Sequence, residues 1–122
     1  MKKMTGAEYM MVVLLGGNVP PEGLTIEGDV VLEGASDRSR LYLEGLDLGG
    51  VRLLGNVRIR NVVFNGDVNL SFTQVAGRSF VFENVTVIGN LTQFEGLRKM
   101  VKDGWHVAVS NITFTGGQQF SL

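Results

Sequence analysis

Hydrophobic and polar residues alternate along much of the chain, and the alternation breaks at an asparagine. In FVFENVTVIGN, residues 80–90, apolar residues occupy every second position up to Asn84 and resume at Val85. VAVSNITFTGG, residues 107–117, has the same pattern around Asn111. Alternation with a period of two predicts strands with one buried face. Because asparagine tolerates the left-handed backbone region, we expect it to bend each strand while both halves stay apolar inward.

This pattern recurs along the chain. VRIRNVVFNG begins at Val57, LYLEGLDLGG at Leu41, and a looser copy, LTIEGDVVLEG, at Leu24. In the four good copies the fifth position is Gly45, Asn61, Asn84 or Asn111, and the tenth is Gly50, Gly66, Gly89 or Gly116. The uneven spacing of the copies favours coils of variable length stacked on one axis over separate hairpins.

About five stacked coils, roughly 4.8 Å apart, are therefore expected between residues 24 and 117. The side chains of Asn61, Asn84 and Asn111 should then form a hydrogen-bonded ladder. The expected interior residues are Phe64, Phe82, Val87, Val109 and Phe114. DVNLSFTQVAGRS, residues 67–79, predicts a third strand and a loop.

The first 17 residues depart from the strand pattern. Thr5 and Glu8 match a T-x-x-E capping box, and the apolar run after them ends at Gly16 and Gly17. This predicts a helix over about residues 6–15 that caps the first coil. A targeting segment, such as a cleaved signal peptide, is the alternative for residues 1–17.

A second helix is expected within the longest gap between copies. Phe94, Leu97 and Val101 lie at helical spacing, and Gly104 follows them. We therefore expect a short surface helix near residues 95–103.

These motifs resemble two groups of known proteins. Strand–Asn–strand coils resemble the right-handed parallel β-helix of the pectin-lyase type. VPPEGLTIEGDVVLEG, residues 19–34, resembles the P-E-G-L-T-x-x-G-D-x-x-L repeat of bacterial and phage-borne solenoid proteins. The resemblance implies an all-β fold: a short right-handed parallel β-helix in one domain, 1–122, with a C-terminal tail at 118–122. Bactofilins have a shorter, more regular apolar repeat than these coils.

Composition excludes several kinds of chemistry. The chain has 122 residues with no cysteine and a net charge of −1, so disulfides, thiolate metal sites and a cysteine nucleophile are excluded. His106 is the single histidine, which leaves a histidine metal cluster or triad without a second member. We interpret Trp105-His106 as a packing anchor. No metal site, cofactor or enzymatic activity is predicted, and a bacterial cytoplasm is the expected location.

Charge is unevenly distributed along the chain. Residues 20–47 carry seven acids against two arginines, a balance of −5, whereas residues from 48 onward carry four acids against seven bases, a balance of +3. A stacked fold would turn this order into an acidic end and a mildly basic end. The candidate partner-binding residues are Glu27, Glu33, Asp37, Glu44 and Asp47. The secondary candidates, for an anionic group, are Arg58, Arg60 and Arg78.

The outward fourth positions of the copies give a second expectation. The residues Glu27, Glu44, Arg60, Glu83 and Ser110 should stack as a surface ladder of ion pairs. Exposed pairs of this kind contribute about 0–1 kcal/mol each, and an open face does not tune the pKa values that acid–base catalysis needs.

The functional hypothesis from sequence is a non-enzymatic rod that binds another protein. The phage-borne resemblance and the acidic end favour a phage or mobile-element inhibitor of a host defence complex, of the anti-CRISPR kind, acting on a protein that itself binds nucleic acid. Neither direct nucleic-acid binding nor membrane binding is expected. A self-assembling solenoid, bactofilin-like or part of a virion, is the alternative, and a homodimer through one end stays open. A carbohydrate-binding or carbohydrate-cleaving β-helix is the second alternative.

Overall fold

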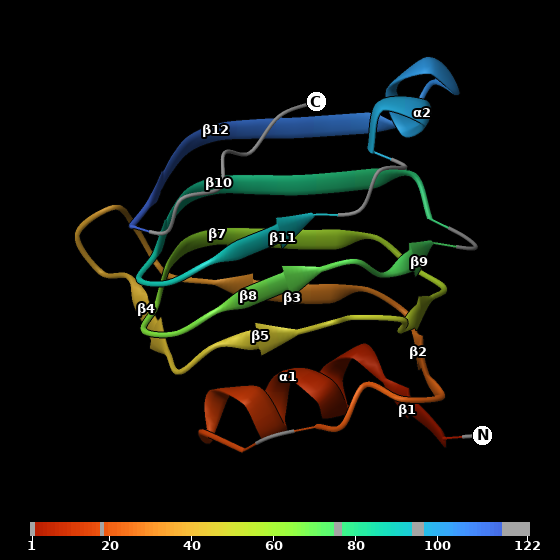
Figure 1. The fold of residues 1–122 in the computed structure, drawn as a ribbon, viewed down its shortest axis with the longest axis horizontal. Helices are drawn as coiled ribbons and strands as arrows, with labels where there is room; N and C mark the ends of the chain where they lie inside the picture. Colours follow the sequence, from red (N-terminus) through yellow and green to blue (C-terminus); the bar gives the residue numbers. More distant parts are fainter. Residues whose placement is uncertain (1, 18, 75–76, 94–96, 116–122) are drawn as a thin grey trace.

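The computed structural model describes residues 2–17, 19–74, 77–93 and 97–115. Its strands form three sheets, and every strand pairing is parallel (Figure 1). Sheet A contains β1 (Lys2–Thr5), β2 (Leu24–Glu27), β6 (Arg52–Leu53) and β9 (Thr73–Gln74). Sheet B contains β3 (Val30–Glu33), β7 (Val57–Phe64), β10 (Ser79–Val87) and β12 (His106–Phe114), with β4 (Leu41–Leu43) also paired to β7. Sheet C contains β5 (Leu46–Asp47), β8 (Val68–Leu70) and β11 (Leu91–Gln93). The expected all-β class is confirmed, with parallel sheets.

The register of sheet B confirms the alignment of three copies. Phe80 lies opposite Val57 on one side and Val107 on the other, as the motif starts require. Asn61, Asn84 and Asn111 have φ values of 55°, 52° and 53°, so the predicted left-handed corners are present. The Nδ2 of Asn84 donates to Oδ1 of Asn61 at 2.8 Å, and Nδ2 of Asn111 donates to Oδ1 of Asn84 at 2.8 Å. The ladder is confirmed.

The alignment of the first two copies was wrong. Leu41 lies opposite Val62 rather than Val57, and it is Val30 that lies opposite Val57. Gly34, not Gly45, meets the Asn61 corner: its N–H donates to the carbonyl of Arg60, and its carbonyl accepts from Asn61 Nδ2. An excursion over residues 34–40 separates β3 from β4 and shifts the motif along the chain.

The expected number of stacked coils, about five, was also too high. Within the described residues, the strand order of sheet A and the main order of sheet B each contain four strands, and that of sheet C contains three. Segments 24–33 and 41–47 do not form separate levels of one sheet, because β2 belongs to sheet A while β3 and β4 both border β7 in sheet B. The segment after Gly66 forms two strands, β8 and β9, rather than one.

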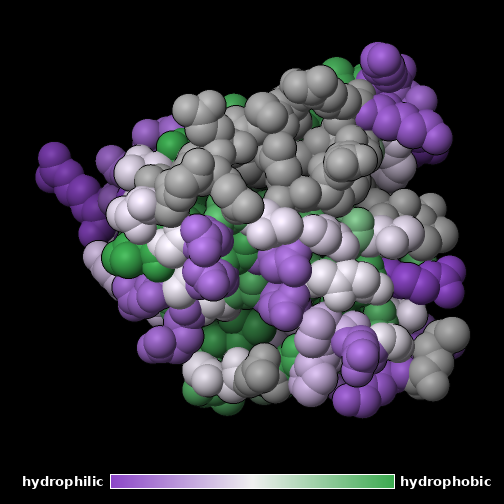
Figure 2. All heavy atoms as spheres, in the orientation of Figure 1, coloured by the Kyte–Doolittle hydropathy of each residue, from purple (hydrophilic) through white to green (hydrophobic). Residues whose placement is uncertain are grey.

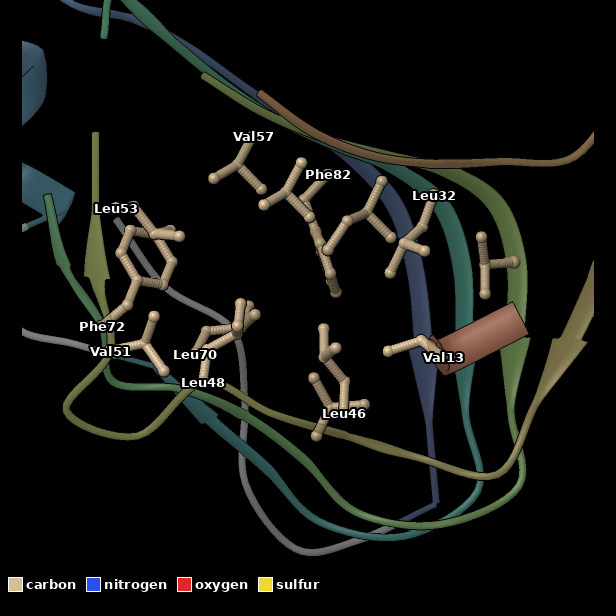
Figure 3. Close-up of a cluster of buried hydrophobic side chains, with 14 of the residues drawn as sticks. Val13, Leu32, Leu46, Leu48, Val51, Leu53, Val57, Leu70, Phe72 and Phe82 are labelled. Carbon is tan, nitrogen blue, oxygen red and sulfur yellow. The ribbon is translucent and has the colours of Figure 1, made fainter. Parts of the chain in front are cut away.

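The buried side chains of the three sheets form a single core. The labelled side chains point into one interior: Leu53 and Phe72 enter from one wall, Leu46, Leu48 and Leu70 from a second, and Phe82 from the wall opposite the second (Figure 3). Of the expected interior residues, Phe64, Phe82 and Val87 are fully buried, whereas Val109 is half-buried at the edge of the core. The side chain of Phe114 and the expected tail at 118–122 lie outside the described residues.

Helix α1 (Gly6–Leu14) begins where the capping box predicted. Thr5 Oγ1 accepts from the Glu8 N–H, and Glu8 Oε1 accepts from the Thr5 N–H, both at 3.0 Å. The helix packs against β3 below the sheets in Figure 1, with Tyr9 and Val13 in the core. A Cβ on Gly6 would lie 1.8 Å from the carbonyl oxygen of Asp29, so only glycine permits this approach. No helix in the described part of the chain is long and apolar enough to cross a membrane.

Strand β1 was not expected from sequence. Lys2–Thr5 pairs with β2 along its whole length and places the capping residue Thr5 opposite Glu27. The first residues therefore belong to sheet A as well as to the start of the helix.

Helix α2 (Leu97–Lys102) confirms the predicted surface helix, but Val101 does not lie on its buried face. Met100 is 7% exposed and joins the core, whereas Val101 is 49% exposed. Trp105 packs against the same core, as expected of an anchor, while His106 is exposed.

Candidate functional site

The five acidic candidates separate into two groups. Glu27 pairs with Lys3 (Oε1 to Nζ, 3.7 Å), and Asp37 pairs with Arg40 (Oδ1 to Nη2, 3.5 Å). Glu33 forms ion pairs with Arg58 (Oε2 to Nε, 3.1 Å) and Arg60 (Oε1 to Nη1, 3.8 Å). In this first group, Glu27, Glu33 and Asp37, the negative charges are therefore balanced by basic side chains of the same molecule.

The ion pairs on the outer face of sheet B differ from the predicted stack. Arg60 lies between Glu33 and Glu83, with its Nε 3.3 Å from Glu83 Oε1, and Ser110 Oγ donates to Glu83 Oε2 at 3.5 Å. Glu33 thus occupies the place that sequence gave to Glu44, and Glu27 lies in sheet A. This correction has the same cause as the misaligned copies: the strand opposite Val57 begins at Val30.

Asp37 belongs to a polar cluster around Asn84, the middle residue of the asparagine ladder. Its Oδ1 accepts from Asn84 Nδ2 at 2.7 Å, and Arg40 donates to both Asn84 Oδ1 and Thr86 Oγ1. The side chain of Arg40 is only 20% exposed. These contacts attach the 34–40 excursion to sheet B, which indicates a structural role for Asp37.

Glu44 and Asp47 form the second group. Among the described residues neither carboxylate has a basic partner. Asp67 also has no basic partner there. The three are brought together because β5 and β8 are neighbours in sheet C, with Leu46 opposite Val68. Asp47 Oδ1 accepts from the Gly49 N–H at 3.0 Å, and Asp67 Oδ1 accepts from the Asn90 N–H at 2.9 Å. Each aspartate therefore keeps a second oxygen that these turns do not use.

The three carboxylates surround a pocket of about 300 Å³ between sheet C and the end of α1, which we call the acidic pocket. Its lining consists of Tyr9, Val13, Gly16, Gly17, Val19, Glu44, Gly45, Leu46, Asp47 and Asp67. Sheet C lies on the face shown in Figure 2, where hydrophilic groups and apolar patches alternate. The negative end of the α1 dipole adds to the charge of the carboxylates.

Tyr9 is the most deeply buried polar residue of this pocket, with 2% of its surface exposed. Burial, and after it the Asp47 carboxylate, raise the pKa of Tyr9 well above its ordinary value. The neutral hydroxyl is thus retained beside the carboxylates of the pocket.

The secondary candidates lie on the other side of the molecule. Arg58 and Arg60 line a second pocket of about 350 Å³ over sheet B, together with Glu83 and His106. Both guanidinium groups already pair with Glu33, so they do not form an open anion site. Arg78 has an exposed side chain, and its backbone N–H donates to Asn56 Oδ1.

Sequence reasoning assigned Glu44 and Asp47 to the acidic end but missed Asp67 and Tyr9. Asp67 is in neither set of sequence candidates, and in the described residues no three histidine, cysteine or acidic side chains converge on a metal position. The register of sheet C, which sequence did not predict, is what places Asp67 beside Gly45.

Comparison of the chain with family models, with curated proteins and with solved structures finds no match.

Proposed function

We propose that this chain is a right-handed parallel β-helix that binds another protein and catalyses no reaction. Successive strands support the coil: β6, β7 and β8 lie in sheets A, B and C, and β9, β10 and β11 repeat this order. Such an arrangement provides a rigid surface at low conformational cost for a partner. The resemblance of residues 19–34 to repeats of bacterial and phage-borne solenoids also supports this proposal.

The observation that carries the binding function is the charge of the acidic pocket. Glu44, Asp47 and Asp67 have no basic partner among the described residues, whereas Glu27 and Asp37 each have one and Glu33 has two. Unpaired carboxylates beside a hollow attract a positively charged surface and increase its association rate.

Positively charged surfaces of this kind occur on proteins that bind nucleic acids. We therefore assign the chain to inhibitors of the anti-CRISPR type, carried by a phage or mobile element, which cover such a surface on a bacterial defence complex. The site of action would then be the host cytoplasm.

The test is affinity capture from a bacterial lysate with matched variants. Wild type and the double variant Glu27→Gln/Glu33→Gln should retain the same basic, nucleic-acid-binding proteins, identified by mass spectrometry. The variant Glu44→Gln/Asp47→Asn, which removes the same number of charges, should lose them, with weaker capture at higher salt. Equal capture by both variants would contradict the proposal.

Self-assembly is the second candidate, and strand β12 favours it. His106–Phe114 is a nine-residue strand at the end of sheet B, and it contains no Lys, Arg, Asp, Glu or Pro. Edge strands usually carry such residues to prevent pairing with other chains. Helix α1 packs against β3 at the opposite end of the sheet, which favours a closed dimer through β12 over a filament.

Light scattering over a dilution series tests this candidate. The wild type should form a dimer at high concentration, and Ser110→Lys should shift it to the monomer because the strand edge then carries a charge. Thr92→Lys in β11 introduces the same charge at another exposed strand position and is the control. A wild-type monomer throughout the series would exclude assembly through β12.

A further inference from the structure

The acidic pocket combines negative charge with an apolar floor. Val13 and Leu46 belong to the core cluster, and Val19 packs against it. Glu44 is exposed, and Asp47 lies on the exposed side of β5. A group that fits both parts must have a cationic head and a hydrocarbon stem.

Tyr9 is a second, independent sign that a ligand enters. The residue is 98% buried and lines the pocket, and no hydrogen bond joins its hydroxyl to any group in the described part of the chain. Among the described residues, the one side-chain polar atom that is both buried and unpartnered is Thr25 Oγ1, so the Tyr9 oxygen is the accessible part of its side chain and is open to an incoming group. Asp47 accepts from Gly49 through one carboxylate oxygen, so its other oxygen and the Tyr9 hydroxyl are both available to a donor that enters the pocket.

A metal ion does not suit this site, because the described carboxylates do not converge on one position. An ammonium group is a better fit: it has three donors, carries one charge and ends a flexible stem of four methylene groups in lysine. Lysine side chains commonly place this stem on apolar surface while the charged end contacts polar groups.

We propose that the acidic pocket binds a lysine side chain presented by the partner protein. The ammonium group donates to the free carboxylate oxygens and to the Tyr9 hydroxyl, and the methylene groups contact the apolar floor. This inference rests on the proposed function, which supplies the partner, and it identifies the chemical group that the pocket recognises.

The experiment uses two small probes of matched shape and the full chain. Nα-acetyl-lysine amide carries the ammonium group, and its Nε-acetylated form carries none. Binding is followed by the amide resonances of Gly16, Gly17 and Gly45, which line the pocket, with Gly104 as a distant reference. The charged probe should cause saturable shifts with a Kd of about 1–10 mM, and the acetylated probe should cause none.

Matched variants locate the site. Glu44→Gln should weaken the charged probe by about threefold, the value of one partly exposed pair, whereas Glu27→Gln should have no effect. Asp67→Asn retains an oxygen for the Asn90 N–H and should weaken the probe to a similar degree.

Four results with the probes would overturn the inference. They are no saturable shift, equal shifts with both probes, equal binding by Glu44→Gln and wild type, and tighter binding of spermidine than of the lysine probe at the same salt concentration. If capture from lysate depends on Glu44 and Asp47 but the probe does not bind, the proposed function stands and the lysine pocket is rejected. Probe binding without any effect of these variants on capture would also reject a lysine of the partner.

Discussion

At the scale of single residues, the asparagine corners carry the most specific chemistry. Asn84 has a φ of 52°, bonds both neighbouring asparagines and contacts Arg40 and Asp37. This position has two requirements: a left-handed backbone conformation, which glycine can also adopt, and a side-chain amide that donates and accepts hydrogen bonds at once.

Two substitutions of Asn84 separate the backbone requirement from the hydrogen-bonding requirement. Asn84→Val should lower the free energy of unfolding by about 2–3 kcal/mol, because it adds backbone strain to the lost hydrogen bonds. Asn84→Gly removes the hydrogen bonds alone and should cost less. Urea denaturation of both variants provides the measurement. A valine variant as stable as the glycine variant would show that φ at this corner is not strained.

Tyr9 gives a residue-scale prediction about pH. Its raised pKa means that the folded protein keeps a proton which the unfolded chain releases above about pH 10. This contribution to stability is complete below about pH 10 and declines as the pH rises beyond it. The loss is limited to about 1.4 kcal/mol per pH unit.

Denaturation of Tyr9→Phe between about pH 8.5 and about pH 11 should therefore show a shallower decline than wild type. Tyr42 is 70% exposed, so Tyr42→Phe serves as the control and should follow wild type. Parallel curves for Tyr9→Phe and wild type would refute the role of this hydroxyl.

At the scale of elements, the short helix α2 shows how packing selects one side chain from a helical pattern. Leu97 and Val101 are one turn apart and suggested the apolar face, but Met100 enters the core while Val101 remains half exposed. The carbonyl of Met100 also accepts from the Trp105 N–H, which turns the chain back toward β12.

The pair Met100→Ala and Val101→Ala tests this packing. Met100→Ala should lower the free energy of unfolding by about 2 kcal/mol, the lower limit for a buried methionine, because the helix lies at the edge of the core. Val101→Ala should change it by less than about 0.5 kcal/mol. Equally small effects of the two variants in thermal denaturation would place both residues at the surface.

At the scale of the whole molecule, the N-terminal segment closes one end of the sheets. Strand β1 pairs with β2, and α1 covers β3 while adding Tyr9 and Val13 to the core. Without this segment, buried residues of β2 and β3 and the open edges of two sheets would face water.

Deletion of residues 1–17 should therefore produce aggregates or new oligomers in light scattering. Thr5→Ala is the milder control: it removes one capping bond, should cost about 1 kcal/mol, and should leave the protein monodisperse. A monodisperse deletion variant of unchanged stability would show that the segment serves another purpose, such as targeting.

The sequence alone determined the local features of this protein. Alternation of apolar residues, the positive φ at three asparagines and the capping box of α1 depend on neighbouring residues, so they can be inferred from short segments. The same reasoning placed Glu44 and Asp47 in an acidic region, although it could not separate them from Glu27, Glu33 and Asp37.

Only the tertiary structure decided which segments lie side by side. The register that places Leu41 opposite Val62, the pairing of Lys2–Thr5 with β2 and the position of Asp67 beside Gly45 all depend on contacts between distant residues. The excursion over residues 34–40 changes the register without altering the hydrophobic alternation on either side, so this alternation does not reveal the change. For this reason the acidic pocket became visible only once the sheets were assembled: its residues come from α1, the segment after α1, β5 and the turns before β5 and β8.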